Sequence, residues 1–491
     1  MFKRSQGTIW KTLDRDLGRI VQIESATAFV SRPLIGPGIA LVFILLAGLA
    51  AALLMDQMPV NMVVVFAAIF GAYMAINIGA NDVANNVGPA VGANALSMGG
   101  AILIAAVAES AGALLAGGDV VSTISKGIID PAALQNSQVF IWAMMAALIS
   151  AALWVNLATW VGAPVSTTHA VVGGVMGAGI AAAGFGAVNW PTMSKIAASW
   201  VISPVLGGVI AAGLLALIKA RVIYREDKIA AARFWVPVLV GLMAGAFAAY
   251  LSVKGLKRIV RIELEVAVMI GLGTGLLVWA LARPWIRRKS EGLENRKRSL
   301  KVLFGLPLVV SAALLSFAHG ANDVANAVGP LAAIVHASEF GNITAKVQIP
   351  VWVMVIGAFG ISFGLFLFGP KLIRMVGTQI TKLNPVRAFC VALSAAVTVI
   401  IASGLGLPVS STHIAVGGIF GVGFFREWHM ERRLRGGARS SGANTVPPKE
   451  RRRRKLVRRS HFMTIIAAWV ITVPAAALMS AVIFLGLNAL L

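Results

Sequence analysis

The sequence contains very little cysteine and few charged residues. Cys390 is the single cysteine among 491 residues, so the chain cannot form an intrachain disulfide. Charged residues make up 13% of the chain, about half of their share in soluble domains, and this excludes a soluble globular protein. What the chain has instead is 58% hydrophobic residues and a mean hydropathy of +0.84, which indicate a polytopic membrane protein.

Acidic residues are scarcer than basic ones, at 19 against 43, and the formal net charge is +24. Such an excess can attract nucleic acid, but Lys and Arg lie almost wholly in the short gaps between apolar runs. Basic residues in such gaps set the orientation of a membrane protein, so we expect no nucleic-acid partner. The first 36 residues are polar and mixed in charge, unlike a cleavable signal peptide. We expect them to form a cytoplasmic tail.

Apolar runs recur along the whole chain, and most are long enough to span a bilayer. No alternation typical of strands appears, and lipid admits only helices or closed barrels, so the predicted fold is all-α. The runs lie at 37–55, 59–93, 100–117, 138–162, 164–183, 196–219, 236–253, 264–282, 302–333, 349–369, 388–407, 409–425 and 463–490.

Two elements of the sequence occur twice. GANDVANNVGP at 79–89, the first signature, returns as GANDVANAVGP at 320–330, the second signature, with ten of eleven positions identical. PVSTTHAVVGGV at 164–175 likewise returns as PVSSTHIAVGGI at 408–419. The same order in both places predicts two homologous halves.

Loop charge predicts that the two halves are inverted relative to each other. The loops around 408–419 are strongly basic, whereas those around 164–175 carry only Lys126 and Lys195. By the positive-inside rule the first pair of loops is cytoplasmic and the second external. The predicted organisation is a cytoplasmic tail at 1–36, an extra transmembrane helix at 37–58, repeat 1 at 59–219, connecting helices with a basic linker at 220–300, and repeat 2 at 301–491 with a basic cytoplasmic loop at 426–461.

Each PVS[ST]TH element lies between two apolar runs whose outer ends fall on one side. Loop charge therefore allows either two full crossings or a re-entrant hairpin. A proline followed by hydroxyl residues is typical of a helix start, where free backbone N–H groups can face an anion. The Asn and Asp of the two signatures favour helix breaks. Broken helices at matching positions of inverted halves indicate the substrate site of a transporter.

The signatures place ionisable groups where lipid surrounds the chain. A carboxylate costs at least a few kcal/mol at the bilayer centre, so we expect Asp82 and Asp323 to face a polar cavity and to bind a cation, Na+ or H+. Amides can ligate a hard cation or donate to an anion, and hydroxyls donate to an oxyanion. The candidate cation residues are Asp82, Asp323, Asn81 and Asn322, with the two carboxylates as metal ligands if the ion is Na+. The candidate anion-binding residues are Asn81, Asn85, Ser166, Thr167, Thr168, Asn322, Asn326, Ser410, Ser411 and Thr412.

Other polar residues of the same runs have simpler interpretations. His169 and His413 are mirrored and could relay protons, but we predict a structural hydrogen-bonding role. His319 has no counterpart, since Ile78 stands in its place, and it is predicted to be a satisfied polar neighbour. Asn86, which becomes Ala327 in the second signature, is also predicted to be structural.

The duplicated GANDVAN signature, each copy followed by a P-V-S-[ST]-T-H element, resembles the PiT family of inorganic phosphate transporters over most of residues 59–490. The resemblance implies uptake of orthophosphate in symport with Na+ or H+, by alternating access, in a homodimer of the cell membrane. It implies neither enzymatic activity nor a bound cofactor. It also implies that the Asp and Asn of both signatures contribute to the cation and phosphate sites, and that the hydroxyl residues hold phosphate.

Two other functions remain open from the residues alone. The same transporter could carry sulfate or another tetrahedral oxyanion, although only phosphate has a proton that a carboxylate could accept. Paired intramembrane aspartates could instead form an aspartyl protease. Against a protease, each Asp lies in an Asn-rich repeat that a carboxylate dyad would not need. An anion channel is disfavoured because acidic residues would repel its ions.

Overall fold

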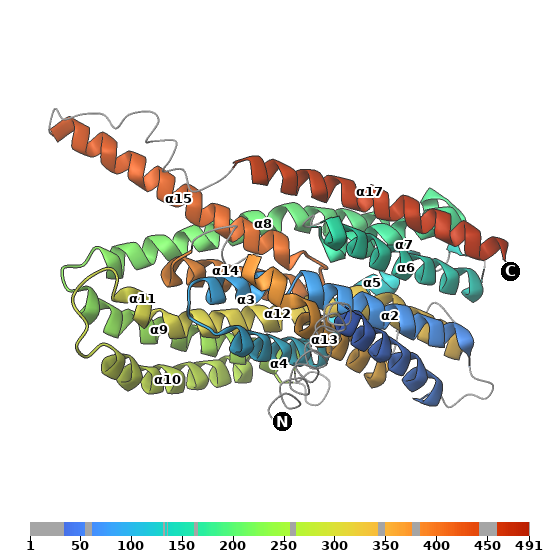
Figure 1. The fold of residues 1–491 in the computed structure, drawn as a ribbon, viewed down its shortest axis with the longest axis horizontal. Helices are drawn as coiled ribbons and strands as arrows, with labels where there is room; N and C mark the ends of the chain where they lie inside the picture. Colours follow the sequence, from blue (N-terminus) through green and yellow to red (C-terminus); the bar gives the residue numbers. More distant parts are fainter. Residues whose placement is uncertain are drawn as a thin grey trace, which may run out of the picture.

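The computed structural model confirms an all-helical membrane protein. It describes residues 34–54, 61–130, 133–134, 136–161, 165–255, 262–341, 349–375, 383–440 and 459–490. Within these ranges the only strand-like pairing is one isolated bridge between Ile129 and Val188. Eleven of the described helices are long and apolar enough to cross a membrane, and Figure 1 shows them running side by side along the long axis of the molecule.

Most helices overlap the predicted apolar runs, but the helix predicted at 409–425 extends to Ser440, into the predicted basic loop, and the helix at Gly118–Lys126 matches no predicted run. A helix at Leu34–Leu54 comes before the first half. The first half comprises α2 (Met62–Asn81), α3 (Ala84–Gly92), α4 (Met98–Ala116), α5 (Gly118–Lys126), α6 (Ser137–Val161), α7 (Thr167–Ala183) and α8 (Trp190–Ile218). The connecting helices are α9 (Lys228–Tyr250) and α10 (Leu264–Lys289). The remainder comprises α11 (Leu300–Leu303), α12 (Gly305–Phe340), α13 (Val351–Met375), α14 (Pro385–Gly404), α15 (Ser411–Ser440) and α17 (Arg459–Ala489).

Several sequence predictions fall outside the described residues. They concern the tail at 1–33, positions 256–261 of the loop after α9, and positions 441–458 of the predicted basic loop. Lys254, which comes just before that second segment, lies 2.7 Å from Asp119 of α5. This ion pair connects the end of the α9 segment to the first half.

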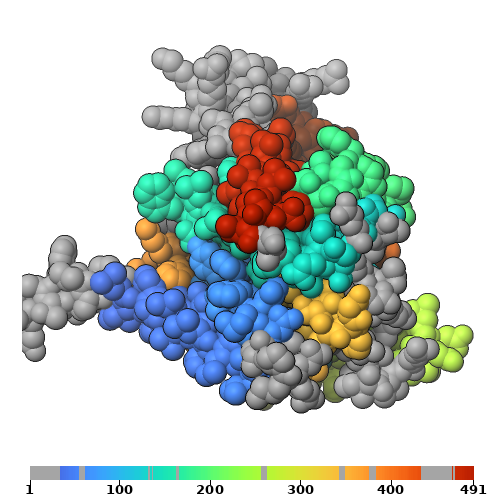
Figure 2. All heavy atoms as spheres, turned by 90° about the vertical axis from the view of Figure 1, so that its right-hand side faces the viewer, coloured from blue at the N-terminus to red at the C-terminus, as the bar shows by residue number. Residues whose placement is uncertain are grey.

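Each half packs mainly against the other half. Helix α2 packs on α13 and α12 packs on α4, while α7 packs on α17 and α15 packs on α8. Figure 2 shows the end of α17 (red) beside teal segments of the first half, in keeping with its contacts with α6 and α7. Small residues permit this close packing in lipid. A Cβ on Gly177 would collide with the carbonyl oxygen of Ala477, and one on Gly421 with that of Gly208.

The described residues of the two PVS[ST]TH elements, 165–169 and 408–413, form the tips of two helical hairpins. Helices α7 and α15 begin at Thr167 and Ser411, as predicted for a helix start. Helix α7 lies against α6, and α15 against α14. The outer ends of the first hairpin lie together, because the Asn189 amide donates to the Ile128 carbonyl at 2.8 Å. Its tip therefore lies at the opposite end, inside the protein.

The two signatures differ in backbone structure. In the first, the helix is interrupted between Asn81 and Ala84, as predicted. In the second, α12 runs unbroken from Gly305 to Phe340, so the prediction of a break there is wrong. The Asn322 amide bonds outside its own helix, to Ser403 and Leu407, as the Asn81 amide of the first signature does to Thr159, so neither asparagine competes for the helix backbone and the sequence of the signature alone does not impose a break.

Candidate functional site

The two hairpin tips, residues 165–169 and 408–413, meet in the interior of the protein. The Thr168 hydroxyl donates to the Val409 carbonyl oxygen at 3.1 Å. The Ser166 hydroxyl accepts from the His169 amide at 3.2 Å, and the Ser410 hydroxyl accepts from the His413 amide at 3.3 Å, so each serine caps its helix. This places the N-terminal ends of α7 and α15 beside each other. Helix N-termini favour negative charge, so together they suit an anion.

Asp82 lies between the two tips. The Thr167 hydroxyl donates to Asp82 Oδ2 at 2.8 Å, and the Thr412 hydroxyl donates to Asp82 Oδ1 at 3.0 Å. The carboxylate is only 2% exposed. One aspartate thus receives a hydroxyl from each half of the chain.

Two asparagines connect each signature to the tip of the other half. Asn85 Nδ2 donates to Thr412 Oγ1 at 2.9 Å. Its counterpart Asn326 Nδ2 donates to Thr168 Oγ1 at 3.1 Å and to Thr167 Oγ1 at 3.2 Å. Asn85 and Asn326 occupy the same position of the two signatures, and Thr412 and Thr168 the same position of the two tips, so each signature bonds the tip of the opposite half. The amides of Asn85 and Asn326 therefore lie together with the hydroxyls of Thr167, Thr168 and Thr412.

Asp323 completes a cluster of possible cation ligands. Ser411 Oγ lies 3.4 Å from Asp323 Oδ2, and ligand atoms of Asp82, His319 and Asp323 all lie within 4.8 Å of one another. The buried Asp323 Oδ1 has no hydrogen-bond partner among the described residues. A buried oxygen without a partner is unfavourable, and carboxylate and hydroxyl oxygens are ligands for hard cations.

Three polar residues of the site were missed as functional candidates. His319 lies with Nδ1 3.2 Å from Glu109 Oε1 and with Nε2 3.0 Å from Asp323 Oδ2. Asn86 Nδ2 donates to the same oxygen of Glu109 at 2.9 Å. A signal for Glu109 was present in the sequence, since it is the single charged residue of α4.

Asn81 and Asn322 lie beside the hairpins rather than among the carboxylate contacts. Asn81 Nδ2 donates to Thr159 Oγ1 of α6 at 2.9 Å. Asn322 Oδ1 accepts from the Val409 amide at 3.1 Å, and its Nδ2 donates to Ser403 Oγ at 3.0 Å. Each side chain therefore joins a signature to a hairpin of its own half.

The mirrored histidines lie in a group of aromatic rings next to the tips. The rings of His169 and His413 meet edge to face, with centroids 4.7 Å apart. Trp200 lies 3.9 Å from the His169 ring and donates to the Pro408 carbonyl at 3.0 Å. The contacts hold the two tips against α8.

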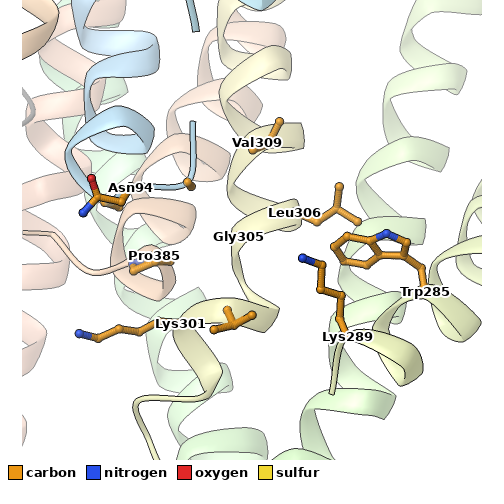
Figure 3. Close-up of a pocket in the computed structure, with 11 residues that line it drawn as sticks. Asn94, Trp285, Lys289, Lys301, Gly305, Leu306, Val309 and Pro385 are labelled. Carbon is orange, nitrogen blue, oxygen red and sulfur yellow. The ribbon is translucent and has the colours of Figure 1, made fainter. Parts of the chain in front are cut away.

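A separate cavity of about 510 Å³ lies between the ends of α10, α12 and α14. Figure 3 shows Lys289, Lys301 and Trp285 around it. Its lining includes none of the described residues of the two tips or the carboxylate cluster. This cavity is therefore distinct from the candidate site.

Comparison with known proteins shows similarity over most of the chain. Residues 78–480 match the model of the phosphate transporter family. A candidate phosphate permease of Helicobacter pylori (strain J99 / ATCC 700824) is 51% identical over 427 residues, 86% of this chain and 80% of that protein. The chloroplastic inorganic phosphate transporter 2-1 of Arabidopsis thaliana is 36% identical, over 84% of this chain and 70% of that protein.

A solved structure supports the same assignment. It is described as the sodium-dependent phosphate transporter, and it superposes with a TM-score of 0.79 and 34% identity over 88% of this chain and 100% of that chain. These relatives are transporters and permeases, not enzymes, which removes the aspartyl protease from consideration. The family model spans the two signatures and both hairpins, and the chain belongs to the phosphate transporter family.

Proposed function

We propose that the protein carries inorganic phosphate across the cell membrane in symport with Na+, through the site formed by the two signatures and the two hairpin tips. Phosphate as the substrate class rests on the family. The observation that carries the coupling is Asp82, a buried carboxylate that bonds one hydroxyl from each tip. The sodium-dependent phosphate transporter of similar structure supports Na+ over H+ as the ion.

Phosphate binds at the N-terminal ends of α7 and α15 in this proposal. The backbone N–H groups of the first helical turns and the hydroxyls of Thr167, Thr168, Ser411 and Thr412 are neutral donors. A hydroxyl can rotate from a carboxylate oxygen to a phosphate oxygen. Neutral donors bind an anion with an affinity low enough to allow its release. Asn85 and Asn326 orient those hydroxyls from the opposite half.

The cation makes phosphate binding favourable next to two carboxylates. Like charges about 4 Å apart repel by roughly 4 kcal/mol at an effective dielectric constant near 20. A Na+ ion held by Asp82 and Asp323 cancels one of their two negative charges and so lowers this repulsion. Because coupling between two ligands is reciprocal, phosphate then raises the affinity for Na+ by the same factor. The carboxylates therefore couple the two gradients without contacting phosphate directly.

Alternating access follows from the way the tips close the site. The contacts that join tips to signatures are a small number of polar bonds, which can break and re-form as a hairpin moves. Each tip belongs to a different half, so release of one and then of the other opens the site to opposite sides of the membrane. We expect the functional unit to be a homodimer, as the family resemblance implies.

Uptake of radiolabelled phosphate by proteoliposomes tests this function. Na+ and H+ gradients are imposed separately, with sulfate as competitor. We expect accumulation under the Na+ gradient, weak competition by sulfate, and loss of Na+ dependence when Asp82→Asn and Asp323→Asn are combined. Glu294→Gln, a change at an exposed carboxylate, is the matched control and should transport normally. Uptake driven by H+ alone would exclude Na+ coupling, and strong inhibition by sulfate would exclude selectivity for phosphate.

A further inference from the structure

The cavity between the ends of α10, α12 and α14 has two chemically different parts. Its volume of about 510 Å³ lies within the usual range of ligand sites. Two basic side chains line it, Lys289 at the end of α10 and Lys301 of α11. The larger apolar residues of its lining are Trp285, Val302, Leu306, Val309 and Pro385. Such a lining suits an amphipathic ligand that carries negative charge.

The two lysines lack a counter-charge among the described residues. No carboxylate in that part of the chain lies within ion-pair distance of Lys289 or Lys301. The Lys289 amine lies 5.6 Å from the centroid of the Trp285 ring, and Figure 3 shows it directed toward Leu306, with Lys301 on the side of Pro385. Both amines can therefore donate to an anion that enters the cavity.

The positive-inside rule assigns this end of the protein to the cytoplasmic face. Between positions 287 and 301 the chain has seven basic residues and two acidic ones. Helix α10 ends within this segment and α12 begins just after it. Short loops rich in Lys and Arg face the cytoplasm, and Trp and Lys side chains are common at the level of the lipid headgroups. The anion that is abundant at this level is the headgroup of an anionic phospholipid.

An apolar row on α10 leads into the cavity. Leu277, Leu281, Trp285 and Lys289 follow one another at intervals of four residues, so they form one ridge along the helix, the α10 row. Helix α10 packs mainly on α9 and leaves Leu277 and Leu281 exposed. The rise from Leu277 to Lys289 is about 18 Å, and one leaflet contains roughly 15 Å of hydrocarbon. An acyl chain along this row would have its headgroup at the cavity.

We propose that the cavity binds an anionic phospholipid of the cytoplasmic leaflet, with the headgroup phosphate at Lys289 and an acyl chain along the α10 row. Lys301 adds positive charge on another side of the cavity, and Leu306 and Val309 of α12 offer a second apolar wall. Inorganic phosphate carries the same anionic group but has no apolar part to cover these side chains. The inference goes beyond the proposed function, because the cavity is distinct from the candidate site.

Basic residues at the end of a helix can also serve only to complement the helix dipole. That role would require neither a cavity nor the α10 row, and it predicts no preference between lipids. Lipid binding to the purified, full-length protein in detergent, measured by native mass spectrometry, separates the two roles. The probes are phosphatidylglycerol, which is anionic, and phosphatidylcholine with the same acyl chains, which has no net charge.

We expect the parent protein to bind phosphatidylglycerol at least about tenfold more tightly than phosphatidylcholine. Lys289→Gln should weaken phosphatidylglycerol binding by at least about tenfold, since it removes a charge-assisted hydrogen bond. Adding Lys301→Gln should weaken it further. Both variants should bind phosphatidylcholine within about threefold of the parent, because its apolar contacts are unchanged. Equal binding of the two lipids by the parent would overturn the inference.

Lys297→Gln with Arg298→Gln is the matched control. It removes two positive charges from the same basic segment, at exposed residues outside the cavity lining, and should leave phosphatidylglycerol binding within about threefold of the parent. Size-exclusion chromatography and thermal melting check that each variant is folded. Equal losses in the control pair and in the Lys289, Lys301 pair would overturn the site, because diffuse positive charge would then account for the binding.

Competition by inorganic phosphate distinguishes a lipid from a free anion. Millimolar inorganic phosphate should displace little phosphatidylglycerol, because it cannot replace the apolar contacts. Full displacement would assign the cavity to free phosphate and overturn the lipid. The same competition with the combined Asp82→Asn, Asp323→Asn variant excludes an indirect effect through the proposed transport site. None of these measurements requires transport, so the lipid site and the proposed symport can fail independently.

Discussion

Replacing Thr412 by valine is predicted to reduce phosphate uptake strongly while leaving the fold intact. Valine nearly matches threonine in shape but lacks the hydroxyl. The change removes the 3.0 Å bond to Asp82 and also the 2.9 Å acceptor for the Asn85 amide. A hydrogen bond to a charged group contributes about 1.5–3 kcal/mol, and a buried donor left without a partner costs about 1–3 kcal/mol. If part of this free energy is lost from the state that has phosphate and the cation bound, uptake should fall by roughly 10- to 100-fold.

The matching change Thr167→Val is predicted to have a smaller effect. It removes the 2.8 Å bond to Asp82, but the Asn326 amide keeps its second acceptor, Thr168 Oγ1, at 3.1 Å. The Asn85 amide has no second acceptor of this kind among the described residues when the Thr412 hydroxyl is removed. The order of uptake should therefore be parent, then Thr167→Val, then Thr412→Val.

Initial rates of phosphate uptake into proteoliposomes, at equal protein content, measure this order. Thr412→Ser, which restores the hydroxyl, should recover most of the activity. Thr192→Val, at the start of α8 and away from the tips, is the matched control and should transport like the parent. Normal uptake by Thr412→Val would refute the assignment of Asp82 and the two tips as the centre of the site.

Three further changes have separate expected outcomes. Gly320→Ala drives a methyl group into the Glu109 carbonyl oxygen, so we expect the protein to lose about 1–3 kcal/mol of stability and to melt at a lower temperature. Gly213→Ala is the control, because a Cβ there meets open space, and it should leave the melting temperature unchanged. Asn326→Ala removes both bonds to the first tip and should reduce uptake by about tenfold; unchanged uptake would show that this amide does not hold the tip. Lys254→Gln breaks a partly exposed ion pair, worth about 0.2–1 kcal/mol, and should leave uptake within about twofold; a larger loss would assign the pair a role in transport.

Internal repetition made most of the fold and much of the site predictable. The two signatures and the two PVS[ST]TH elements identified Asp82, Thr167 and Thr412 before any geometry was known, because a duplicated polar residue in lipid is rarely incidental. The start of each hairpin helix was also predictable from proline and hydroxyl residues. Local chemistry was sufficient for these features because they depend on residues that are neighbours in sequence.

Other features depend on contacts that no local pattern encodes. A search for repeats finds what the halves share, so it passed over Glu109 and His319, where they differ. Nothing in the sequence around Asn85 shows that its partner is Thr412 of the other half. The two signatures are identical at ten of eleven positions, yet the helix is interrupted in the first and continuous in the second. Such outcomes require the tertiary arrangement.

The exchange of contacts between halves has a consequence for how the protein is made. Asn85 is synthesised long before Thr412, its partner, and α7 before α17, against which it packs. During synthesis the first signature and the first tip therefore enter the membrane before the second tip exists, and Asp82 then lacks its bond from the Thr412 hydroxyl. Until the final hairpin inserts, the translocation machinery or the helices already inserted must keep these polar groups out of contact with lipid. A chain truncated before α14 would span the bilayer many times and still lack Thr412 and the second tip.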